Sequence, residues 1–146
     1  MLHIYAAIQL VMTQGVVSAP SQPQCAVSFA TRFVDRFSDL PEAIRSDLLR
    51  SGQVVEPGEP FNDTDAILDP NLPNRRFIRG GRSGEKWFVW LEHGGFDRHF
   101  DVLGYRQLWE KTDSYRWYRA AELQGESCVA INAFLGGVWT PADGQD

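Results

Sequence analysis

The beginning of the sequence lacks charge, because no lysine, arginine, aspartate or glutamate precedes Arg32. Within this stretch, residues 4–12 are almost wholly apolar, and the small residues Val17-Ser18-Ala19 follow them. An apolar centre followed by small residues is typical of a secretory signal peptide. We therefore expect residues 1–19 to be a signal peptide, with cleavage near Ala19 and export of the chain to the periplasm or as a secreted protein.

Two properties of the same stretch speak against a signal peptide. No lysine or arginine forms a positive region at its start, and Gln9 interrupts the apolar run, so a buried N-terminal helix or strand is the alternative. The run is shorter than the ~20 apolar residues that a membrane-spanning helix needs. We expect no permanent membrane anchor.

Cysteine is scarce, with only Cys25 and Cys128 in the chain. In an exported protein the compartment permits a disulfide, and this pair would join the start of the mature domain to its C-terminal part. The alternative is two separate buried thiols, as expected in a cytosolic protein. The disulfide prediction therefore depends on the signal peptide.

Motifs that identify an enzyme or a cofactor are missing. No G-x-S-x-G occurs, no GK[ST] follows the glycines at 80, 81 and 84, and there is no third histidine or cysteine pair in the mature chain to complete a zinc site. The formal net charge of −5 disfavours nucleic acid as a partner. We expect no cofactor, no metal and no nucleic acid, and the question of an enzyme stays open, with a non-catalytic protein favoured.

The length and the hydrophobic pattern predict one α+β domain over residues 20–146. Helical spacing is found in 27–36 and in 38–52, and from Arg76 onward the pattern changes to a three-stranded antiparallel meander. Residues 107–127 are ambiguous. For residues 128–139 we expect a strand, with a short helix as the alternative. The predicted fold is N-terminal helices packed on an antiparallel β-meander.

The stretch FVWLEHGGFDRHFDVLGYR, residues 88–106, predicts a hairpin that turns at Gly94-Gly95. A loop of two or four residues places Glu92 directly opposite Asp97. One face of the hairpin is then the core face and the other is polar. The predicted core face consists of Trp87, Val89, Leu91, Phe100 and Val102.

This register gathers groups that are able to do chemistry. Glu92 and Asp97 would form a close carboxylate pair, His99 would lie beside them over Trp90, and Asp101 would orient the imidazole. These are the parts of an acid–base or metal site, so Glu92, Asp97 and His99 are the candidate catalytic residues of a small hydrolase or metal-dependent enzyme. The alternative is a solvated hairpin tip without chemistry.

A second candidate site is basic. The cluster contains Arg75, Arg76, Arg79, Arg82 and Lys86, with aromatic residues between them. With Trp90, the four arginines form the candidate ligand-binding set for an anionic ligand or an acidic protein. The alternative is edge-strand charge that prevents aggregation. The favoured hypothesis is an exported, non-catalytic domain that binds an unknown protein or anionic ligand through its meander.

Overall fold

The structure, a computed structural model, describes residues 25–64, 69–110 and 114–139. In this part of the chain an antiparallel sheet has the strand order β1-β2-β3-β4-β5, so each strand pairs with its neighbour in the sequence. The strands are β1 (Arg32–Val34), β2 (Arg75–Ser83), β3 (Lys86–His93), β4 (His99–Glu110) and β5 (Ser114–Gln124). The helices are the short 3-10 helix η1 (Phe37–Asp39), α1 (Glu42–Arg50) and α2 (Ser127–Leu135).

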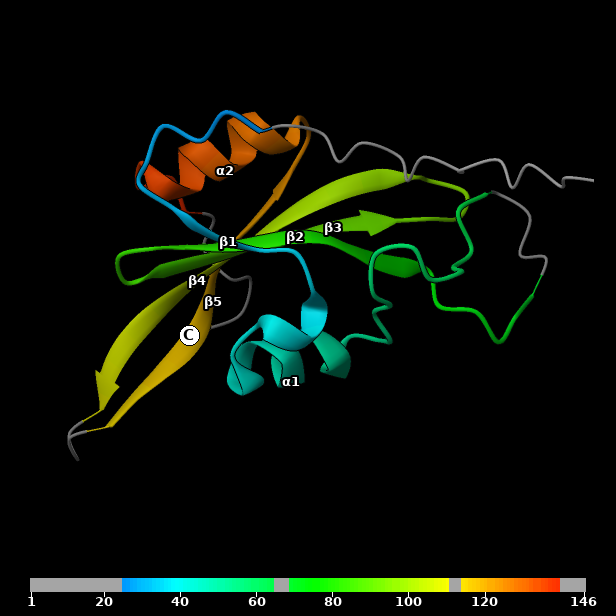
Figure 1. The fold of residues 1–146 in the computed structure, drawn as a ribbon, viewed down its shortest axis with the longest axis horizontal. Coiled ribbons are helices and arrows are strands. Elements are labelled where there is room, and N and C mark those ends of the chain that lie inside the picture. The colour runs from blue at the N-terminus through cyan, green and yellow to red at the C-terminus, as the bar shows by residue number, and fades with distance from the viewer. Residues whose placement is uncertain (1–24, 65–68, 111–113, 140–146) are drawn as a thin grey trace, which may run out of the picture.

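The two α-helices cover opposite faces of the sheet (Figure 1). Ile44 and Leu48 of α1 pack against residues such as Leu91 of β3. Ile131 and Phe134 of α2 pack against the residues of β3 that alternate with these, such as Trp90. Since neighbouring residues of a strand point to opposite faces, both faces of β3 are core. This arrangement explains why residues 87–91 form an uninterrupted apolar run.

The predicted α+β class is confirmed as a five-stranded antiparallel sheet with two helices, but two of the predicted elements are wrong. Residues 27–36 do not form a helix, because residues 32–34 are paired with β2 as the edge strand β1. Residues 127–135 form α2 rather than a strand. The Glu126 side chain starts this helix by accepting hydrogen bonds from the backbone N–H groups of Cys128 and Val129. The helix predicted at 38–52 is confirmed in its central part as α1, whereas its predicted start belongs to the 3-10 helix η1.

The disulfide between Cys25 and Cys128 is present and joins the segment before β1 to α2. Asn132 of α2 strengthens the same junction, since its side chain donates a hydrogen bond to the carbonyl of Ala26 and accepts one from the N–H of Ser28. The predicted signal peptide lies outside the described residues. Within them, no helix is long and apolar enough to cross a membrane.

Candidate functional site

The β3–β4 hairpin has a different register from the one predicted. His93 faces His99 and Glu92 faces Phe100, so the connection consists of residues 94–98 rather than a loop of two or four residues. The predicted opposition of Glu92 and Asp97 is therefore wrong. The prediction failed because it assumed one apolar and one polar face, whereas both faces of this sheet are covered by a helix.

Glu92 lies on the α2 face of the sheet and is 1% exposed. Its two carboxylate oxygens accept separate ion-paired hydrogen bonds, one from Arg76 at 2.5 Å and one from Arg98. Two guanidinium groups thus neutralise the buried carboxylate, as burial of a charge requires. Glu92 serves here to hold strand β2 and the hairpin turn together.

The other two predicted catalytic residues lie elsewhere. The Asp97 side chain is 96% exposed in the turn. His99 lies on the α1 face, because it pairs with His93, the neighbour of Glu92 in the strand. The structure therefore does not bring Glu92, Asp97 and His99 together in one pocket.

Most of the predicted basic cluster is engaged within the protein. Arg75 is buried, and its guanidinium donates hydrogen bonds to the carbonyls of Leu48 and Gly52 at the end of α1. Burial lowers the pKa of this guanidinium. Arg76 holds Glu92, and Arg79 is paired with Asp35 at 2.7 Å. Lys86 donates to the carbonyl of Leu135 at the C-terminal end of α2.

The remaining members of the predicted ligand set are Trp90 and Arg82. Trp90 is 4% exposed and packs in the core on the α2 face, so it offers no surface to a ligand. Arg82 is exposed, and its Nε donates a hydrogen bond to the carbonyl of Gly84. Of the four predicted arginines, Arg82 alone lines the pocket described next.

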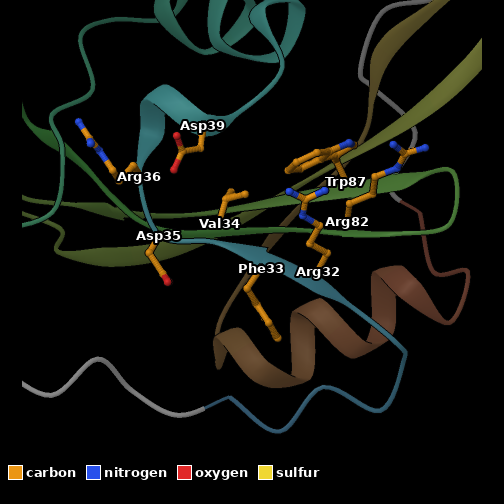
Figure 2. Close-up of a pocket in the computed structure, with 8 residues that line it drawn as sticks. All are labelled: Arg32, Phe33, Val34, Asp35, Arg36, Asp39, Arg82 and Trp87. Carbon is orange, nitrogen blue, oxygen red and sulfur yellow. The ribbon is translucent and has the colours of Figure 1, made fainter.

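A pocket of about 710 Å³ opens at the edge of the sheet, beside β1 (Figure 2). Its lining consists of Arg32, Phe33, Val34, Asp35, Arg36, Asp39, Arg82 and Trp87. Arg32 faces Arg82 directly across the β1–β2 pair, and Arg82 in turn faces Trp87 of β3. The two guanidinium groups and the indole ring therefore share one cross-strand row on the α1 face.

The charge balance of this pocket favours an anion. Asp35 is already paired with Arg79, which leaves Asp39 as the one other carboxylate among the lining residues. The lining also contains three arginines, Arg32, Arg36 and Arg82, so its positive charges outnumber its free carboxylate. The prediction from the sequence missed Arg32, since residues 27–36 were assigned to a helix, and only the strand pairing places this residue opposite Arg82.

A second cluster lies on the α1 face where β3 ends and β4 begins. The His93 and His99 rings are stacked, with centroids 4.7 Å apart, and both approach the carboxylate of Asp101. The Nε2 atom of His93 is 2.9 Å from Oδ2 of Asp101, and the Nε2 atom of His99 is 3.6 Å from the same oxygen. Both imidazoles are about one-third exposed, whereas the Asp101 side chain is 4% exposed.

Asp101 is charged in spite of its burial. Burial on its own raises the pKa of this carboxyl, but the hydrogen bond from His93 and the charges of His93 and His99 lower it below the usual value. The Gln124 side chain, across from Asp101 on β5, adds to this lowering. Even so, in the described part of the chain the buried Oδ1 atom of Asp101 has no hydrogen-bond partner in good geometry.

Comparison of the chain with protein-family models, with curated proteins and with solved structures gives no match. The functions proposed below for the pocket beside β1 and for the cluster of His93, His99 and Asp101 therefore rest on the geometry of these residues.

Proposed function

We propose that this protein is an exported, non-catalytic binding domain that holds the carboxylate or phosphate group of a small anionic ligand between Arg32 and Arg82. The disulfide supports export, because exported compartments permit such bridges to form and persist. The pocket beside β1 supports binding, because it combines a concave surface with convergent polar groups at one place on the sheet.

The observation that carries this proposal is the direct opposition of Arg32 and Arg82. Like charges at opposed positions of an antiparallel pair destabilise the sheet. Within residues 25–64, 69–110 and 114–139, neither guanidinium has an ion-pair partner that relieves the repulsion. An anion bridging the two groups converts the repulsion into two charge-assisted contacts, and guanidinium groups bind carboxylates and phosphates in this bidentate way.

Trp87 and Arg36 define how such a ligand lies. The Trp87 ring borders the row of guanidinium groups and gives the ligand an apolar wall (Figure 2). Arg36 follows β1 and adds a third positive charge to the lining. Since the three guanidinium groups are exposed to solvent, binding should weaken as salt is added.

The experiment titrates the disulfide-intact protein with inorganic phosphate and with succinate, and follows the arginine Nε–H signals by NMR. Saturable shifts are expected in both titrations. The double variant Arg32→Gln/Arg82→Gln should bind about tenfold more weakly or worse, because each charge-assisted hydrogen bond is worth about 1.5–3 kcal/mol.

The matched control is Arg50→Gln, which removes one positive charge from an exposed side chain of α1 outside the pocket lining. It should leave binding unchanged. An equal loss in the control would show that only the overall charge attracts the anion, and the pocket would then have no special role. If the protein binds poly-glutamate but neither small anion, its ligand is an acidic segment of a protein partner and not a small anion.

A further inference from the structure

His93, His99 and Asp101 have the spacing of ligands around one metal ion. Ligand atoms that share a zinc ion at about 2.0–2.2 Å lie about 3–3.5 Å from one another. The two imidazole–carboxylate distances here are 2.9 and 3.6 Å, and the three ligand atoms all lie within 4.8 Å of one another. The three ligand atoms are therefore close enough to one another to share a single ion.

We propose that His93, His99 and Asp101 bind one divalent transition-metal ion of the zinc class, with the remaining coordination positions open to water or to a ligand. This inference does not rest on the anion-binding pocket, which uses different residues. The favoured expectation from the sequence was that no metal is bound, because a third histidine or a cysteine pair is missing. The alternative, a metal-dependent enzyme, used Glu92, Asp97 and His99, a different set of residues.

The buried carboxylate is an independent observation that points to a ligand. Asp101 is more than nine-tenths buried, and its Oδ1 atom lacks a hydrogen-bond partner within the described residues. A buried carboxylate oxygen without a hydrogen bond in good geometry is costly for a protein. A cation held at Oδ2 would compensate the negative charge of this buried carboxylate.

The fold also prepares the imidazoles for coordination. His93 and His99 are directly paired residues of β3 and β4, so the backbone fixes their separation. In the neutral tautomer whose Nδ1 donates a hydrogen bond to the carbonyl of Asp97, the Nε2 atom of His99 carries the lone pair that a metal ion needs. A backbone partner of this kind on the second ring nitrogen is the usual support of a metal-binding histidine.

The donor set decides the class of ion. Two imidazole nitrogens and one carboxylate suit zinc, copper, nickel or ferrous iron, whereas magnesium and calcium prefer sites built from oxygen alone. Three protein ligands with partial exposure to solvent are typical of an open site rather than of a closed structural zinc site. The ion would also link β3 to β4 next to the hairpin turn.

The test titrates the tag-free, disulfide-intact protein with Zn²⁺ by calorimetry, and repeats the titration with Mg²⁺. We expect one Zn²⁺ per chain and no Mg²⁺ binding at the same concentrations. Asp101→Asn and His93→Gln should each weaken Zn²⁺ binding by at least about tenfold, a loss that changes in outer-shell partners already produce. Circular dichroism in EDTA checks that each variant folds.

The matched control is Glu85→Gln, which removes the same charge from an exposed side chain in the turn between β2 and β3, at the other end of β3 from the cluster. It should leave the affinity for Zn²⁺ unchanged. An equal loss in Glu85→Gln and Asp101→Asn, or Zn²⁺ binding that survives in both Asp101→Asn and His93→Gln, would overturn the proposal.

A measurement on the wild-type protein covers the case in which the variants do not fold. Long-range NMR correlation of the imidazole nitrogens should show the Nε2 resonances of His93 and His99 shifting together on addition of one equivalent of Zn²⁺. Imidazole signals that stay unchanged at saturating Zn²⁺ would overturn the proposal. Phosphate binding at Arg32 and Arg82 would be unaffected by that result, so the two proposals fail independently.

Discussion

At the scale of single residues, Asp47 joins α1 to the two C-terminal strands of the sheet. Its Oδ2 atom accepts a hydrogen bond from the hydroxyl of Tyr105 at 2.7 Å and two from the guanidinium of Arg119 at 2.8 and 3.0 Å. Burial alone raises the pKa of Asp47, but the hydrogen bonds from Tyr105 and Arg119 and the charge of Arg119 lower it below its usual value. This carboxylate therefore stabilises the fold in its ionised form.

The first prediction concerns the pH dependence of this contribution. An unfolded aspartate has a pKa of about 3.9, and the folded value of Asp47 is lower. The stabilisation is then fully present above the unfolded pKa and is lost as the pH falls through the folded pKa. Asp47→Asn should lower the free energy of unfolding by about 1–3 kcal/mol at pH 7, and the difference from wild type should shrink below about pH 4.

Urea unfolding between pH 3 and pH 7 measures this difference. The control is Asp39→Asn, which changes an exposed carboxyl that has no ion pair among the described residues. A constant difference between wild type and Asp47→Asn over the whole pH range would show that the charge of Asp47 does not stabilise the fold.

The arginines of residues 75–82 show which properties of single residues can be predicted from the sequence and which cannot. It predicts that a basic, aromatic-flanked segment lies in β structure, and this holds for residues 75–83. It does not tell which guanidinium finds a partner inside the protein. Arg75 reaches the end of α1, and Arg79 reaches Asp35, a residue 44 positions away in the sequence. Such partners depend on the tertiary fold, so the residues left for a ligand could not be predicted.

At the scale of elements, the β3–β4 hairpin decides the geometry of the metal-ligand cluster. The sequence predicts the two strands, and these are confirmed, but the predicted turn of two or four residues is a connection of five residues, 94–98. The register is wrong by an odd number of residues, and an odd shift moves every side chain of one strand to the other face. As a consequence, the residues that lie close together are His93, His99 and Asp101, and not the predicted Glu92, Asp97 and His99.

Gly94 helps to hold this register. Its N–H donates a hydrogen bond to the carbonyl of Asn74 at 2.8 Å, and a Cβ placed on it would lie 1.8 Å from the carbonyl oxygen of Asn62. The turn is thus packed against the loop that follows α1. No property of the local sequence 88–106 shows this contact, because Asn62 lies some thirty positions earlier.

The second prediction follows from this close packing. Gly94→Ala forces the turn and the segment at Asn62 apart, and we expect a loss of about 1–3 kcal/mol in the free energy of unfolding. The control is Gly84→Asn in the β2–β3 turn, where φ is +58° and no atom lies within 4 Å of an added Cβ. Asparagine tolerates this conformation, so its effect should be small. Equal stability of Gly94→Ala and wild type in urea would contradict the packing of this turn.

At the scale of the whole molecule, the two helices cover the two faces of the sheet, and the disulfide joins α2 to the segment before β1. The sequence predicts α1 from its apolar stripe, but it predicts a strand where α2 forms, because a fully covered strand and a short buried helix have similar composition. The five-stranded sheet needs α2 on its second face, where Gly104 gives room for Phe134. The cysteine pair was the one long-range contact that the sequence could specify, because the chain holds only two cysteines.

The last prediction joins export to stability. Protein recovered from its native host should lack residues 1–19, and its mass should increase by two hydrogens on reduction. The disulfide spans 103 positions, and a loop of about that length is worth about 2–5 kcal/mol, because the bridge restricts the unfolded chain. Reductant should therefore lower the free energy of unfolding of the wild type by that amount, and Cys25→Ser/Cys128→Ser should show the same loss without reductant.

The variant Asn132→Ala separates the covalent link from the packing around it. It removes the hydrogen bonds to Ala26 and Ser28 but keeps the bridge, so its stability should still fall when reductant is added. Because the bridged segment runs directly into β1, which carries Arg32, reduction should also weaken phosphate binding at the pocket. A full-length product with two free thiols would contradict export and the role of the bridge together, while unchanged stability of the reduced mature protein would contradict the role of the bridge alone.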